Sequence, residues 1–191
     1  LFRYNFFSFN KPGLLDTERY VKIFESFWPD NSFEALKKPL YVVATDLLQG
    51  REEVFYTGEL IRPLLASAAL PPIFSPVKIG DRLYADGGIM NNFPLEPLAK
   101  KVDFVIGSNV SVVKTLTRRE LRSSYQLTNR TTALMIYAIN REKISRCNLA
   151  FEALELEKIG VLDKKGIEKA YKIGYDHASA KLEAALNQTS S

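Results

Sequence analysis

The hydrophobic residues of this chain form short apolar runs that alternate with longer segments of helical spacing. Short runs rich in β-branched and aromatic residues indicate strands, here over residues 40–44, 53–57, 77–79, 82–85, 102–110 and 148–156. Apolar residues repeated every three or four positions indicate helices, here over residues 17–28, 60–70, 93–101, 127–146 and 165–186. Strands that alternate with helices predict an α/β protein, which we expect to be a three-layer α/β/α sandwich with a mainly parallel central sheet.

The stretch from Ala66 to Pro94 combines a helix end, two strands and a glycine turn. Its helix must stop at Pro71-Pro72, because proline cannot continue a helix. Asp86 ends the second strand, at the position where an α/β sheet commonly carries its working groups. Gly87 and Gly88 follow directly. We expect these glycines to adopt positive φ and to let the turn pass close to another backbone segment.

This stretch carries three motifs in order: A-S-x-A-x-P-x-x-F-x-P from Ala66, D-G-G at Asp86 and N-x-P at Asn92. Their order resembles that of the patatin-like phospholipase family. Three flanking segments resemble the same family, namely Tyr41 to Gly50, Asp103 to Val110 and Gly160 to His177. The resemblance runs from about Leu40 onward. It implies that residues 1–191 are the C-terminal two-thirds of a single patatin-like domain.

Two motifs that the family carries near its N-terminus do not occur in these residues. One is a glycine-rich loop that forms the oxyanion hole, and the other is the G-x-S-x-G turn that holds the nucleophilic serine. No glycine here is followed by serine two positions later and glycine two positions after that. We therefore expect the nucleophile to lie upstream of Leu1, and residues 1–191 alone to be inactive.

The resemblance implies a serine acyl hydrolase that acts on phospholipid, lysophospholipid or other lipid esters. In that family, the aspartate of D-G-G and the serine form a dyad without histidine, so Asp86 would be the base and Gly87 and Gly88 would support it. From the residues alone, Asp86 could equally be a turn residue that binds nearby amides. A non-catalytic lipid-binding or assembly module of the same fold is the alternative function, and a G-x-S-x-G motif upstream would separate the two.

Composition limits which kinds of metal site and catalytic group these residues can form. The chain of 191 residues is 46% hydrophobic and carries one cysteine, Cys147, and one histidine, His177. A single cysteine excludes an intramolecular disulfide and multi-cysteine metal sites, so we expect no metal and no cofactor. We interpret His177 as a surface or helix-packing residue. Ser67 and Ser75 lie outside any nucleophile motif, and we expect both to be structural.

The net charge of +4 is concentrated in one segment. Between Lys114 and Arg146 there are eight Lys or Arg and two acids, Glu120 and Glu142. The segment is either a solvated loop and helix face or a peripheral contact for anionic phospholipid head groups. It carries no nucleic-acid-binding motif, so we expect no nucleic-acid partner. We expect the protein to be cytoplasmic or peripherally bound to a membrane. The sequence leaves the oligomeric state open.

Overall fold

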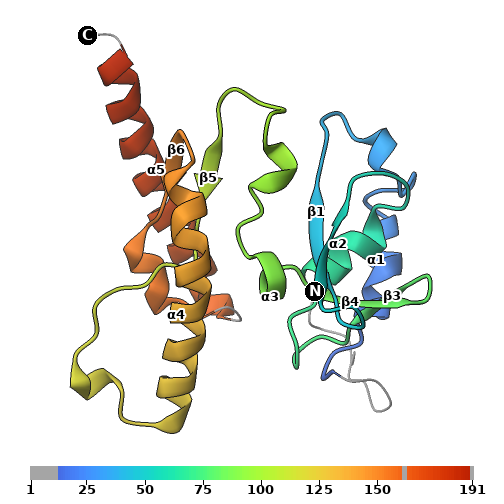
Figure 1. Cartoon of the computed structure of the whole chain (residues 1–191), viewed down its shortest axis with the longest axis horizontal. Coiled ribbons are helices and arrows are strands. Elements are labelled where there is room, and N and C mark those ends of the chain that lie inside the picture. The colour runs from blue at the N-terminus through green and yellow to red at the C-terminus, as the bar shows by residue number, and fades with distance from the viewer. Residues whose placement is uncertain (1–12, 161–162, 190–191) are drawn as a thin grey trace. The chain divides into compact units, whose positions relative to one another are not determined.

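The computed structural model describes residues 13–160 and 163–189 (Figure 1). The chain divides into two compact units, residues 1–97 and 98–191. Both units combine strands and helices. The α/β class that the sequence predicts is therefore confirmed.

The first unit is built on a four-stranded sheet in the order β2-β1-β4-β3. Its strands are β1 (Val42–Asp46), β2 (Arg51–Phe55), β3 (Val77–Ile79) and β4 (Arg82–Asp86). All three pairings in this sheet are antiparallel. The prediction of a mainly parallel sheet is thus wrong for the described residues. Parallel neighbours need a crossover of about a dozen residues or more, whereas a four-residue turn joins β1 to β2 and a two-residue turn joins β3 to β4.

The turn after β1 is stabilised by the fully buried carboxylate of Asp46. One carboxylate oxygen accepts hydrogen bonds from the amides of Leu48 and Gln49 at 3.0 and 3.1 Å. The other accepts a hydrogen bond from Arg82 Nη1 on β4 at 2.6 Å. Burial acts to raise the pKa of Asp46, but the Arg82 and amide hydrogen bonds outweigh it and hold that pKa below its ordinary value.

We expect Arg82→Gln to lower the melting temperature at neutral pH by roughly 5 °C. Because the folded-state pKa of Asp46 is lowered, its stabilisation is present above the unfolded pKa of about 3.9 and is lost as the pH falls through the folded value. The deficit of Arg82→Gln should therefore shrink in acid. Thermal melts from neutral to acidic pH measure this. Arg51→Gln, which removes an exposed pair with Glu53, is the control, and an equal deficit in both variants would contradict the prediction.

The core of the first unit lies between this sheet and α2 (Ile61–Ser67). Ile61, Leu65 and Ala66 of α2 are buried against Ala44 and Tyr84 of the sheet. Thr17–Tyr20 forms a 3₁₀ turn, and α1 (Val21–Glu25) continues from it. Asp16 caps this segment by accepting a hydrogen bond from the Glu18 amide. These helices cover the sheet, which ends at the Asp86 turn.

The helix expected over residues 93–101 does not form. The chain instead makes α3 (Gly88–Asn91) directly after β4, followed by a 3₁₀ turn at Glu96–Leu98. Two prolines, Pro94 and Pro97, interrupt the expected segment. Each lacks the backbone N–H that an α-helix requires in its interior, so helical structure here is confined to short turns.

The second unit contains two long helices and a two-stranded parallel sheet. The helices are α4 (Ser124–Ser145) and α5 (Ile167–Thr189), and the strands are β5 (Ile106–Ser108) and β6 (Leu149–Phe151). Both strands are shorter than the sequence predicts. Three 3₁₀ turns at Arg118–Glu120, Leu154–Lys158 and Lys164–Gly166 complete the unit. Within the described ranges, none of the helices is long and apolar enough to cross a membrane.

Candidate active site

Asp86 lies at the end of β4, and its backbone is fixed on both sides. Its amide donates a hydrogen bond to the carbonyl of Ala69 at 3.1 Å. Its carbonyl accepts one from the hydroxyl of Thr45 on β1 at 2.8 Å. Within the sheet, Asp86 is paired with Ala44 of the same neighbouring strand. The sheet therefore holds the backbone of Asp86 in a defined position, which a reactive side chain requires.

The carboxylate of Asp86 is only lightly hydrogen-bonded. Its Oδ1 accepts a hydrogen bond from the Gly88 amide at 2.7 Å. Burial raises the pKa of Asp86 above its ordinary value, and the Gly88 hydrogen bond opposes this only in part. By contrast, Asp46 is held by an arginine and two amides, and its pKa is lowered. Of these two carboxylates on neighbouring strands, Asp86 is the better suited to accept a proton.

Gly87 and Gly88 are needed for close approach. A Cβ on Gly87 would collide with the backbone carbonyl of Val43 in β1, 2.8 Å from its carbon atom. A Cβ on Gly88 would lie 2.9 Å from Asp86 Oδ1 and 2.6 Å from Asn92 Oδ1. The expected close approach is confirmed. The expected positive φ is wrong, since Gly87 has a φ of −61° and neither glycine is among those with positive φ.

The short helix α3 is tied to the sheet through Asn91, which is buried. Its amide nitrogen donates to Glu52 on β2 at 2.6 Å and to Glu96 after the helix at 3.0 Å. These hydrogen bonds hold the segment that carries the Gly88 amide. The sequence shows the Asn91-Asn92 pair, but nothing in it identifies Glu52 as a partner 39 residues earlier.

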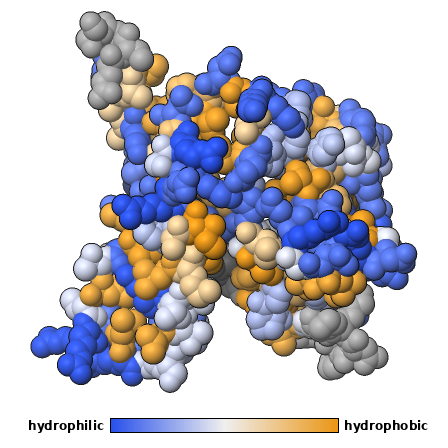
Figure 2. All heavy atoms as spheres, in the orientation of Figure 1, coloured by the Kyte–Doolittle hydropathy of each residue, from blue (hydrophilic) through white to orange (hydrophobic). Residues whose placement is uncertain are grey.

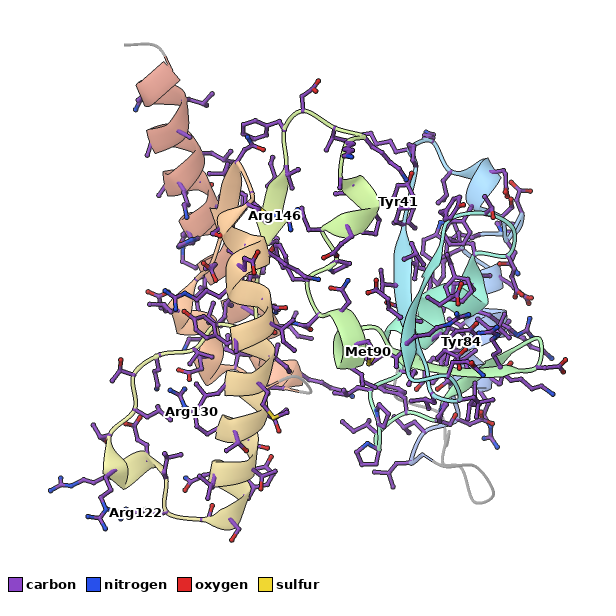
Figure 3. The ribbon with its side chains drawn as sticks, in the orientation of Figure 1. Tyr41, Tyr84, Met90, Arg122, Arg130 and Arg146 are labelled. Atoms are coloured by element: carbon purple, nitrogen blue, oxygen red, sulfur yellow. The ribbon has the colours of Figure 1, made fainter. Side chains whose placement is uncertain are left out.

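A cavity of about 360 Å³ opens beside the Asp86 carboxylate. It lies within the first unit and is lined by residues that precede or belong to β1, by α2 and by the turn after β4: Tyr41, Val42, Val43, Leu64, Ser67, Ala68, Asp86, Gly87, Gly88, Asn91, Asn92 and Pro94. Figure 3 labels Tyr41 ahead of β1 and Met90 on α3, on two of the segments that form it. Apolar side chains form much of the wall, so the cavity suits an apolar substrate group.

The structure brings Ser67 to this cavity as well. Nothing in the sequence associates Ser67 with Asp86, because Ser67 lies outside any nucleophile motif, in a segment of small residues. Its place at the last turn of α2 brings it to the wall that Asp86 also lines. Ser75, in contrast, is fully buried, and its hydroxyl accepts a hydrogen bond from the amide of Thr17 at 3.0 Å. Ser75 thus has the structural place that the sequence suggests.

His177 lies on α5 in the second unit, and its ring nitrogen Nε2 accepts a hydrogen bond from the amide of Glu152 at 3.3 Å. A histidine that accepts a backbone hydrogen bond after β6 is engaged in packing that helix against the strand. The thiol of Cys147 is partly buried, which raises its pKa. In the described part of the chain, no group of three or more His, Cys, Asp or Glu residues could hold a metal ion.

A larger hollow of about 640 Å³ lies elsewhere in the first unit. Its charged walls include Arg62, which pairs with Glu59 at 2.8 Å and with Glu18 at 3.6 Å. Both carboxylates of the hollow are thus paired with the same guanidinium. The Asp86 carboxylate has no such cationic partner, and we place the candidate site at the smaller Asp86 cavity.

These features define an α/β protein with a candidate acid–base site on a strand–turn–helix segment. Residues 1–99 match the sequence model of the patatin-like phospholipase family. The chain belongs to this family. The match takes in Asp86, Gly87 and Gly88, but not the segments 103–110 and 160–177 that the sequence comparison also suggested.

Two relatives illustrate the similarity. An uncharacterized NTE family protein of Mycobacterium tuberculosis is 35% identical over 92 residues, which cover 48% of this chain and 26% of that protein. A probable lipid hydrolase of Invertebrate iridescent virus 6 is 28% identical over 184 residues, which cover 84% of this chain and 60% of that protein. The chain thus spans about a quarter of the mycobacterial relative and three-fifths of the viral one.

Proposed function

We propose that this chain is part of a serine acyl hydrolase that cleaves lipid esters, with phospholipid or lysophospholipid as the substrate class. One observation carries the proposal: a partly buried carboxylate with a raised pKa stands at the end of β4 beside a largely apolar cavity. The name of the family and the name of the viral relative support the same class of reaction.

In the proposed mechanism, Asp86 is the general base of a Ser-Asp dyad. It takes the proton of a serine hydroxyl as that oxygen attacks the ester carbonyl, and an acyl-enzyme forms. A raised pKa makes the carboxylate a better proton acceptor than an ordinary aspartate. The Gly88 amide fixes one carboxylate oxygen and leaves the other for the serine. Water then hydrolyses the acyl-enzyme.

The proposed mechanism also needs a serine nucleophile and an oxyanion hole. We propose that both lie outside residues 1–191, on a glycine-rich loop and a G-x-S-x-G turn that complete one domain with this chain. Backbone amides of such a loop would stabilise the developing oxyanion, a contribution of about 3–4 kcal/mol per donor in well-studied cases. No metal or cofactor takes part in this chemistry.

Residues 1–191 expressed alone should therefore hydrolyse p-nitrophenyl butyrate no faster than buffer does, whereas the protein at its natural full length should turn it over. A fluorophosphonate probe should label the full-length protein on a serine outside these residues. Peptide mapping of the labelled protein identifies that serine.

Two outcomes would contradict this arrangement. Hydrolysis by residues 1–191 that is lost in Ser67→Ala would make Ser67, which lines the Asp86 cavity, the nucleophile. A full-length protein that neither hydrolyses esters nor reacts with the probe would favour the alternative, a non-catalytic lipid-binding or assembly module.

A further inference from the structure

One face of α4 is uncharged, and on it large apolar side chains are exposed among three exposed threonines. Leu127, Leu134, Met135 and Ile139 are between 42% and 68% exposed. Residues 127 to 139 contain one charged residue, Arg130, whose side chain is only 16% exposed. At 1.5 Å per residue, this apolar face is about 18 Å long. A soluble protein seldom leaves so many large apolar side chains of one helix exposed without a partner.

Two of the eight cations between Lys114 and Arg146 form ion pairs within the second unit. Arg130 Nη2 donates to the carbonyl of Lys114 at 2.8 Å, and its guanidinium lies 4.0 Å from Glu157. The ammonium group of Lys114 lies 3.4 Å from Glu157 and 3.6 Å from Glu120. These two cations stabilise the loop before α4 (residues 114–123), so we do not count them as binding groups for an external anion.

Three other cations of the segment lie in this loop on either side of Glu120. Arg118, Arg119 and Arg122 are all exposed, and none of their side chains has an ion pair or hydrogen bond with any described residue. Figure 3 shows Arg122 pointing away from the ribbon at the tip of the loop. Figure 2 shows hydrophobic residues gathered over α4 and hydrophilic ones at this tip. No acidic residue occurs between positions 121 and 141.

We propose that the α4 face (Leu127, Leu134, Met135 and Ile139) and the arginine loop (Arg118, Arg119 and Arg122) form a docking surface for an anionic lipid bilayer. The apolar side chains enter the boundary between head groups and acyl chains, and the arginines bind the phosphates. Charge complementarity favours this occupant, because three exposed arginines lie in the loop that leads into α4, and the exposed residues 127–139 of that helix carry no acidic group. The inference extends the proposed function, since an enzyme that cleaves lipid esters must reach a membrane.

The test measures binding of the full-length protein to vesicles made of equal parts of phosphatidylglycerol and phosphatidylcholine. Binding should weaken steeply between about 0.1 and about 1 M salt, over which the screening length falls from about 10 to about 3 Å. The triple variant Arg118→Gln, Arg119→Gln, Arg122→Gln should bind about 100-fold more weakly. The double variant Met135→Gln, Ile139→Gln should lose about tenfold or more, because two large apolar side chains no longer enter the bilayer.

A matched control removes three exposed cations from the first unit, in the variant Lys22→Gln, Lys37→Gln, Lys38→Gln. It should bind the same vesicles as well as the wild type does. Circular dichroism melts verify that every variant is folded. Binding is measured without turnover, so a catalytically inactive protein that still binds vesicles refutes the proposed function and leaves the docking surface intact.

Three outcomes would overturn the docking surface. The wild type could fail to bind the vesicles, the control could lose as much binding as the arginine variant, or binding could be equal on pure phosphatidylcholine. If vesicle binding is absent and Met135→Gln, Ile139→Gln instead abolishes self-association in analytical ultracentrifugation, the α4 face is an interface between copies of this protein.

Discussion

Asp86→Asn should reduce ester hydrolysis by the full-length protein by roughly 10²–10⁴-fold, because it removes the basic oxygen of the proposed dyad. The substitution preserves size, and the asparagine carbonyl can still accept the hydrogen bond from the Gly88 amide. A loss at the upper end of this range is expected, since no described side chain within the Asp86 cavity offers another carboxylate. Steady-state kinetics with a soluble ester measure the change.

The same substitution, Asp86→Asn, should not lower the thermal stability of the protein. The pKa of Asp86 is raised in the folded state, so this group favours folding only at low pH and loses that contribution as the pH rises through the folded value. At neutral pH the buried charge therefore opposes folding. Asp86→Asn should melt at or above the wild-type temperature. A purely structural Asp86 would lower the melting temperature and would lose activity only as folding is lost.

The pH profile gives an independent check. The rate constant kcat/KM should rise with pH as the Asp86 carboxyl ionises, with a midpoint above the ordinary value of about 3.9. This limb should disappear in Asp86→Asn. His177→Ala is the control and should retain nearly full turnover, because His177 binds the Glu152 amide in the second unit. A folded, active Asp86→Asn protein, or a folded, inactive His177→Ala protein, would refute the dyad.

Replacing Gly87 or Gly88 by alanine should have different effects: the first on stability, and the second on activity. Gly87→Ala presses its methyl group into the backbone of Val43 on β1, which cannot move without disturbing the sheet. Overpacking of this kind costs about 1–3 kcal/mol and sometimes more, equivalent to a melting temperature lowered by roughly 2–10 °C. Gly88→Ala instead presses on the side chains of Asn92 and Asp86. Both can rotate, so the fold should survive.

Activity should show the complementary pattern. In Gly88→Ala the carboxylate of Asp86 must move away from the Gly88 amide, and a displacement of about 1 Å can cost about 10²-fold in rate. Gly174→Ala is the control. It lies in α5 with no atom within 4 Å of its added Cβ, so alanine should stabilise the helix by about 0.5–1 kcal/mol. A Gly88→Ala protein of wild-type activity would show that the position of this carboxylate does not matter.

Motif order was sufficient to identify the family. A-S-x-A-x-P-x-x-F-x-P, D-G-G and N-x-P lie between Ala66 and Pro94, within residues 1–99 that match the family. Local structure at the candidate site was also predictable, because a strand end and a tight turn depend on neighbours in the sequence. β4 ends at Asp86, as the pattern predicts. The helix predicted over residues 93–101 is absent, because Pro97 as well as Pro94 lacks the N–H donor that a helix interior needs.

The sequence by itself determined the α/β class, the family and the position of Asp86, all of which depend on residue type and short-range spacing. Only the tertiary structure decided the direction of strand pairing, because antiparallel and parallel neighbours share the same alternation of side chains. It also decided the partners of Asp86 and Asp46, which come from strands about 40 residues away. Hydrogen bonds over such separations follow from how the sheet pairs. Burial raises the pKa of Asp86, whereas the hydrogen bonds that Asp46 accepts outweigh burial and lower its pKa.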